Sequence, residues 1–356
     1  MFDRVSSFGR SYQLSYQTNA MQTQLNQLTG ELSSGQKANP EASLGTQAAL
    51  LYQLQSQSDQ DSGLQTELTV SSQRLDTTQT ALTSLASSLQ TVATAAQGIT
   101  AGDASGLGAV GSQASSTINQ VLSLMNTSFL GQGVFGGDST TQPVQAADAP
   151  GGLTAVTQNI LSAAVSANGG PLSQSDINNL INGPNGLASV FSDTNSNPGQ
   201  NYTGAIYTGS TDGQPTTVVI GNNQTVQYDA SANQPAFRDL LQGLSMLSML
   251  SAPSSQLDDT AKTQLLSQAT SVLTNAQQEI TNLQGSLGAV QSSVSAATDA
   301  QQSAASATQA QILTYVQADT YGDSTQISTL QEQLQATYEL TEQISQLSLV
   351  HYMPTN

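Results

Sequence analysis

Cysteine is absent from this chain of 356 residues, and aromatic residues make up only 4% of it. Without cysteine there are no disulfides, thiolate metal sites or cysteine nucleophiles. Scarce aromatics indicate a core built from aliphatic and small side chains. No run approaches the ~20 apolar residues that span a bilayer, and no positively charged segment followed by an apolar run opens the chain. Any export is therefore expected to use a route without a Sec signal peptide.

Basic residues are also scarce, with six Lys and Arg against 24 Asp and Glu, which gives a formal net charge of −18. No cation lies between Arg74 and Arg238. Binding to phosphates requires clustered cations, so the sequence predicts neither nucleic-acid binding nor docking on an anionic membrane. An acidic surface is typical of a protein that stays soluble at high concentration.

Candidate catalytic or metal-binding residues are few. The single histidine, His351, lies close to the C-terminus, where a catalytic base would be poorly held. Asp258 and Asp259 precede a helical pattern, which favours helix capping over acid–base chemistry. The stretch from Asp193 resembles the opening of a calcium loop, but Pro198 and Gly204 occupy the positions that need glycine and glutamate. We predict no enzymatic activity, no metal site and no cofactor.

Both ends of the chain carry narrow apolar seams at helical spacing. A longer seam runs from Ala269 to Val294 in steps of three and four. A third helical segment is expected from about Ser112 to Leu130. A break between helices is expected around Tyr321 and Gly322. Isolated one-sided helices are marginal. Either the other end of the chain or neighbouring copies must cover the seams. The predicted contact residues are Leu14, Met21, Leu25, Leu28, Leu32, Leu75, Leu82, Leu85, Leu89, Ile327, Leu330, Leu334, Leu340, Ile344 and Leu347.

The middle of the chain, from about Gly131 to Pro253, is rich in Gly, Pro, Asn and Asp. Three β-prone runs, AIYTGS, TTVVIG and QTVQYDA, indicate a small antiparallel meander. Short helices are expected at 154–166 and 236–250. The fold class is therefore mainly α: a long antiparallel, coiled-coil-like helical rod from both chain ends, with an inserted small α+β domain.

The stretch LTGELSSGQKANP, at 28–40, comes close to a phosphate-binding loop. Such a loop needs lysine directly after the second glycine, but Gln36 intervenes and the preceding pattern is helical. A helix stop fits better. Gly35 can adopt a left-handed cap, Lys37 lies near the negative helix end, and Pro40 prevents continuation.

ELSSGQKANP resembles the stretch of the flagellin superfamily in which the first helix ends and a loop leads to the second. FLGQGVFGGDSTTQPV at 129–144, FRDLLQGLSML at 237–247 and the ending LSLVHY are similar, in that order, to segments of the superfamily's hook–filament junction branch, the hook-associated protein 3 family. QGSLGAVQSSV at 284–294 resembles a run in which the family carries arginine at the place of Gln291.

The resemblance implies a non-enzymatic structural subunit of the bacterial flagellum. It implies extracellular location after type III export with a chaperone, and assembly in a ring between the hook-side junction protein and the filament flagellin. The corresponding division is 1–44 (inner-tube helix and turn), 45–130 and 254–320 (halves of the rod), 131–253 (outer domain) and 321–356 (inner-tube helix). Two alternatives remain: a filament flagellin, and a secreted adhesin or polysaccharide-binding surface protein.

Overall fold

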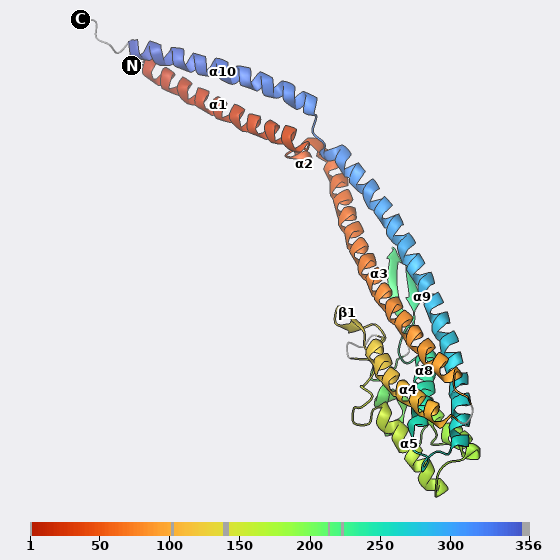
Figure 1. The fold of residues 1–356 in the computed structure, drawn as a ribbon. Coiled ribbons are helices and arrows are strands. Elements are labelled where there is room, and N and C mark those ends of the chain that lie inside the picture. Colours follow the sequence, from red (N-terminus) through yellow and green to blue (C-terminus); the bar gives the residue numbers. More distant parts are fainter. Residues whose placement is uncertain (1, 101–102, 138–141, 213, 222–223, 351–356) are drawn as a thin grey trace. The chain divides into compact units, whose positions relative to one another are not determined.

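The computed structural model describes residues 2–100, 103–137, 142–212, 214–221 and 224–350. Long helices occupy both ends of the chain, and short helices with two small antiparallel sheets occupy the middle (Figure 1). This confirms the predicted mainly α class with a small α+β insertion. The helices α1 Phe2–Ser34, α2 Pro40–Leu44 and α3 Ala48–Gln97 form the N-terminal part, and α9 Asp259–Val316 and α10 Thr320–Val350 form the C-terminal part.

The chain divides into two compact units, and the division falls inside α3 and inside α9. We call Met1–Gly63 with Gln302–Asn356 the terminal unit, and Leu64–Gln301 the central unit. The central unit includes residues 131–253 together with the adjoining parts of α3 and α9. The residues that the sequence suggested as a separate outer domain thus share one core with these helices.

The central core lies where α3, α4 Ala104–Met125, α8 Pro235–Ser248 and α9 meet. Leu82 and Leu85 from α3, Leu244 from α8 and Ile280 from α9 are fully buried there. Helix α4 approaches the chain after α8 so closely that a Cβ atom on Gly111 would lie 2.4 Å from the backbone N of Ser251. Burial of aliphatic side chains stabilises this unit by about 2 kcal/mol for each large residue.

Helix α4 differs from its expected bounds at both ends. It begins at Ala104, well before Ser112, because Asp103 caps it by accepting a hydrogen bond from the Gly106 N–H. It ends at Met125 because the next residue, Asn126, turns its side chain to the backbone of Val144, bonding both its N–H and its C=O. These two hydrogen bonds fix the direction in which the chain leaves α4 toward the middle segment.

The middle holds two small sheets, and the expected meander of three strands is wrong in its first strand. The ladder β1 Ser128–Phe129 with β2 Gln132–Gly133 and the ladder β3 Thr216–Gly221 with β4 Gln224–Tyr228 are both antiparallel. The AIYTGS run forms no strand. Thr203 is extended and Gly204 has φ +98°, so residues 202–206 make a turn that is not regular helix, and the buried rings of Tyr202 and Tyr207 stack at 6.1 Å.

Three short helices complete the middle. They are α5 Leu153–Asn168, α6 Ile177–Asn182 and α7 Leu187–Phe191. Helices α5 and α8 agree with the segments expected at 154–166 and 236–250, whereas α6 and α7 were not expected. All of them face the central core with apolar residues such as Leu153, Ile177 and Leu187.

Arg238 of α8 contacts several segments of the middle of the chain. Its guanidinium forms an ion pair of 2.8 Å with Asp193, donates to the carbonyl oxygens of Phe191 and Asn233, and lies over the ring of Tyr202 at 4.7 Å. A charge-assisted network of this kind offsets the cost of placing a cation inside the unit. The stretch from Asp193, which resembles the opening of a calcium loop, therefore binds the guanidinium of Arg238.

The break between α9 and α10 lies at 317–319, earlier than expected, so Tyr321 and Gly322 belong to the first turn of α10. Asp319 caps that turn by accepting a hydrogen bond of 3.0 Å from the Gly322 N–H. Among the described residues, no helix combines the length and apolar character that crossing a membrane requires.

Candidate assembly surface

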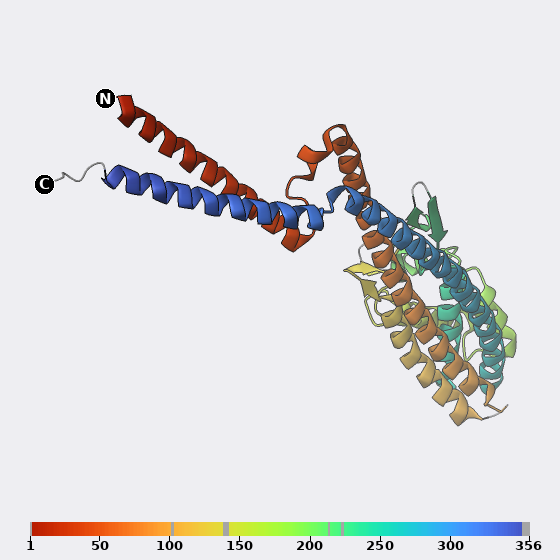
Figure 2. The same cartoon turned by 90° about the horizontal axis from the view of Figure 1, so that it is seen from above.

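Helices α1 and α10 lie side by side in the terminal unit and run antiparallel, as Figures 1 and 2 both show. We call them the terminal helix pair. Leu28 of α1 and Leu330 and Leu334 of α10 are buried between them, and Leu14, Met21, Leu25 and Ile327 are half-buried on the same seam. The two chain ends thus cover each other's seams in part. The Gln22 side chain adds a cross-pair hydrogen bond of 2.7 Å to the Tyr338 hydroxyl.

Two predicted seam residues lie off the seam. Leu32 is 40% exposed and Leu340 is 53% exposed. In α1 the seam position after Leu28 is occupied by Glu31, which is buried. Leu32 is the next residue along the helix, so its side chain points away from the seam. Ile344 and Leu347 belong to α10, but their side chains lie outside the described residues, as does His351.

The four predicted contact residues on α3 contact their own chain. Leu75, Leu82, Leu85 and Leu89 each have no exposed surface and belong to the core of the central unit. A neighbouring copy cannot reach them in this structure. Their helical spacing correctly predicted that they are buried. The spacing could not distinguish burial within one chain from burial between chains, and these four residues do not belong to the exposed surface.

Exposed tyrosines on the terminal unit were missing from the sequence-based set. Tyr12 and Tyr16 on α1 are each 73% exposed, and on α10 Tyr321 is 83% and Tyr338 51% exposed. Tyr12 and Tyr16 are four residues apart, so they share one face of α1, and that face does not contain Leu14 and Met21. This spacing was the available signal. Large exposed rings on a helix pair are typical of a surface that a partner covers.

The terminal helix pair is held at one end by a backbone crossing that we call the joint, made of residues 31–38 and 316–323. Helix α1 ends at Ser34, and Gly35 has φ +69°, the left-handed conformation of a helix stop. The Lys37 N–H donates to the carbonyl of Val316 at 2.8 Å, and the Ala318 N–H donates to the carbonyl of Gly35 at 3.0 Å. Pro40 then takes the first position of the short helix α2.

The joint contains buried carboxyl groups. The Glu31 Oε1 atom accepts hydrogen bonds from the Ala38 N–H at 3.1 Å and from the Gln27 side chain at 2.9 Å. Burial raises the pKa of Asp323, and the charges of Glu31 and Asp319 raise it further, while Lys37 lowers it. Lys37 therefore acts on an acidic neighbour, and the stretch at 28–40 forms no phosphate loop.

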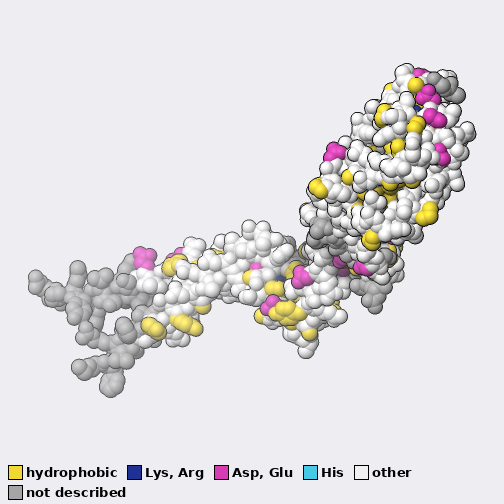
Figure 3. Space-filling model, turned by 90° about the horizontal axis from the view of Figure 1, so that it is seen from below, with side chains coloured by type: hydrophobic (Ala, Val, Ile, Leu, Met, Phe, Trp, Pro, Cys, Tyr) yellow, Lys and Arg dark blue, Asp and Glu magenta, His cyan; other side chains and the backbone are white. Residues whose placement is uncertain are grey.

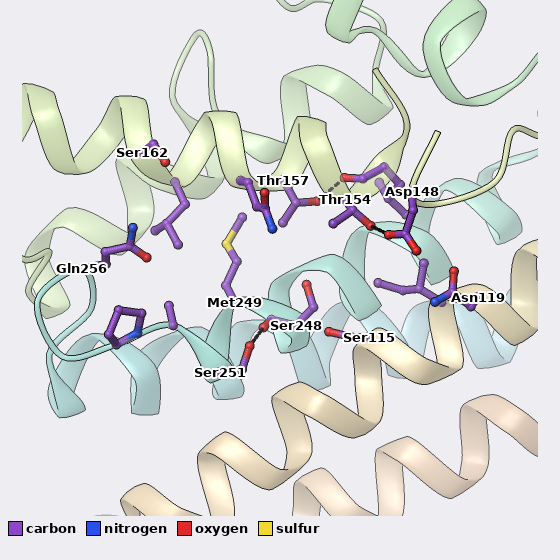
Figure 4. A pocket seen from close by; sticks show the side chains of 16 residues that line it. Ser115, Asn119, Asp148, Thr154, Thr157, Ser162, Ser248, Met249, Ser251 and Gln256 are labelled. Atoms are coloured by element: carbon purple, nitrogen blue, oxygen red, sulfur yellow. Dashed lines mark hydrogen bonds between the residues drawn. The ribbon is translucent and has the colours of Figure 1, made fainter. Parts of the chain in front are cut away.

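The central unit has a pocket of about 440 Å³ between α4, α5 and the segment after α8 (Figure 4). Its hydroxyl groups bond locally, as Thr154 does to Asp148 and Ser251 to the Ser248 carbonyl. Among the described residues no group of three or more His, Asp or Glu is placed to hold a metal ion. Asp258 instead caps α9 through the Ala261 N–H at 2.7 Å.

The central unit keeps its cations inside. Arg74 is half-buried, the Arg238 side chain is 17% exposed and Lys262 is 6% exposed. On the face in Figure 3, acidic side chains are scattered over the surface while Lys and Arg are nearly absent, and hydrophobic side chains also show along the terminal unit. Such a surface gives copies of this unit like charge.

Comparison with protein families gives two matches, one at each end of the chain. Residues 5–140 match the bacterial flagellin N-terminal helical region, and residues 260–353 match the bacterial flagellin C-terminal helical region. No curated protein matches the chain. The two matched regions cover well over half of the chain. They include nearly all of α1 and α10, the terminal helix pair, and of α3, α4 and α9, which surround the central core together with α8. The chain belongs to the flagellin superfamily, whose members are structural subunits of the bacterial flagellum.

Proposed function

We propose that this protein is the subunit that joins the flagellar hook to the filament. It would be exported unfolded, form a ring by self-association, and contact the hook-side junction protein on one side and filament flagellin on the other. Its role is mechanical, because it adapts one helical lattice to another through packed side chains. The same subunit would need no cofactor and no catalytic residue.

The observation that carries the assembly role is the incomplete burial of the terminal helix pair. Among its predicted apolar contact residues whose side chains the structure describes, only Leu28, Leu330 and Leu334 are buried, and Tyr12 and Tyr16 lie on the outer side. Helices with a narrow seam and exposed rings gain most of their stability from neighbours. A second copy that covers these residues supplies that stability.

The order of segments favours the junction over the filament. The FLGQGVFGGDSTTQPV segment begins a few residues after α4 and includes β2, FRDLLQGLSML lies in α8, and LSLVHY lies close to the C-terminus. This order is similar to that of the hook–filament junction branch. A filament flagellin is the second candidate, because the matched helical regions are those of flagellin itself.

Immunogold labelling of intact flagella separates the two candidates. An antibody against the central unit should label one short band at the base of each filament, whereas an antibody against filament flagellin, used as the control on the same cells, should label the whole length. Labelling by the first antibody along the filament would reject the junction role and leave a filament flagellin.

A further inference from the structure

Asp323 is a buried carboxyl group with an unsatisfied oxygen. Its side chain lies in the first turn of α10 and is 8% exposed, and its Oδ2 atom has no hydrogen-bond partner. A buried ionised carboxylate with a free oxygen is costly, and a protonated carboxyl group is much less so. Burial at this turn therefore shifts Asp323 toward its neutral form, which raises its pKa.

The charged groups that act on Asp323 come from each segment of the joint. Glu31 of α1 is also 8% exposed, Asp319 precedes α10, and Lys37 comes from the turn after α1. Lys37 is the only one of these that carries positive charge, and the described residues Lys37 and Asp323 form no ion pair within 4.0 Å. No ion pair at the joint therefore neutralises Asp323.

We propose that Asp323 and Glu31 form a proton-operated latch at the joint of the terminal helix pair. With a proton on Asp323, the carboxyl group has an O–H that can donate to an acceptor such as Glu31, and α10 is held against α1. When Asp323 loses the proton to water, a buried carboxylate with an unpartnered oxygen is left at the joint and the joint loosens. The proposal is independent of whether the subunit lies at the junction or along the filament.

The direction of the pH effect follows from the raised pKa of Asp323. The closed pair binds the proton more tightly than the open pair, so closing is favoured as pH falls and the advantage is lost as pH rises through the raised value. The sensitive range lies above the ordinary aspartate pKa of ~3.9. The geometry gives no metal site as a substitute for the proton, since the described acidic residues form no ligand group.

The absence of cysteine allows a direct distance measurement on the full chain. The double variant Thr29→Cys with Ser328→Cys places one spin label on α1 and one on α10, at two exposed positions. The distance between the two labels reports whether the pair is closed. Pulsed dipolar spectroscopy on the monomer should show a broader distance distribution at about pH 7 than at about pH 4, close to the ordinary aspartate pKa.

Two further variants make the result specific. Asp323→Asn removes the charge and supplies an N–H donor, so its distribution should be narrow at both pH values. Glu332→Gln removes an exposed acid from the same helix and should keep the response of the parent. The latch is rejected if the parent distribution does not change with pH, if Asp323→Asn still broadens on raising the pH, or if Glu332→Gln abolishes the response.

Discussion

The Gln291 side chain of α9 donates a hydrogen bond of 2.9 Å to the carboxylate of Asp76 on α3. The next two contacts of this kind join Gln284 to Thr83 at 3.4 Å and Gln277 to Gln90 at 2.7 Å. Each step is seven residues on both helices, which is the repeat of an antiparallel coiled coil. This ladder sets the register of α3 against α9, and it does so without charged pairs. Gln291 stands where the similar family run carries arginine.

The ladder and the core beneath it should contribute very differently to stability. Leu85→Ala removes a fully buried side chain and should lower the free energy of unfolding by about 2–5 kcal/mol. Gln291→Ala removes one exposed hydrogen bond and should cost less than about 1 kcal/mol. Urea unfolding followed by circular dichroism measures both, and equal losses would contradict the separation of core and register roles.

Arg238 should make the central unit sensitive to acid through Asp193. Burial alone would raise the pKa of Asp193, but hydrogen bonds from Thr203 and Arg238, with the charge of Arg238, outweigh it and lower the pKa. The stabilisation is therefore complete above the unfolded-state pKa of ~3.9 and is lost as pH falls through the lower folded value.

The Arg238→Met variant tests this network, because methionine keeps the aliphatic stem and removes the charge. The variant should lose about 1–3 kcal/mol near neutral pH, since Asp193 is left with an unpaired charge. The difference from the parent should shrink below the ordinary aspartate pKa. Arg238→Lys serves as the control, because it keeps the charge but cannot make all the contacts to Phe191 and Asn233. A constant difference at every pH would show that Asp193 plays no part.

The long helices could be predicted from the sequence because their apolar residues repeat over many turns. Among the short elements, α5, α8 and the β3–β4 ladder could be predicted, whereas α6, α7 and the turn at 202–206 could not. Helix α7 contains only Leu187–Phe191, and burial of Val190 and Phe191 in the core holds it in place. The turn at Tyr202 is stabilised by stacking of its ring on Tyr207, which residue propensities do not reveal.

The seam between the two helices of the terminal pair was predictable in part. The seam from Leu14 to Leu28 and from Ile327 to Leu334 follows directly from apolar spacing. The buried position of Glu31 does not, because a search for apolar repeats passes over a carboxyl group. For the same reason Leu32 and Leu340 were assigned to a seam from which the structure excludes them.

The exposed tyrosines should matter for assembly and not for the fold of the single chain. Tyr16→Ala removes a ring that is 73% exposed, so the monomer should unfold within about 0.5 kcal/mol of the parent. The concentration at which purified subunits polymerise should rise, because less apolar surface is covered on association. Light scattering over a dilution series measures that concentration.

The matched control for Tyr16→Ala is Leu130→Ala. Leu130 is 78% exposed and lies in the central unit, outside the terminal helix pair. Its loss should leave the polymerisation concentration unchanged. A similar rise in both variants would mean that exposed apolar area in general, and not the terminal pair, drives association.

Amide hydrogen exchange before and after polymerisation tests most directly the claim that neighbouring copies complete the terminal helix pair. At neutral pH a confirmed monomer should exchange rapidly over roughly the first 40 and last 40 residues, while the core around Leu82 and Ile280 stays protected, because only tertiary packing holds such helices. Polymerisation should slow exchange in both ends together. Strong protection of both ends in the monomer, unchanged on polymerisation, would contradict the account.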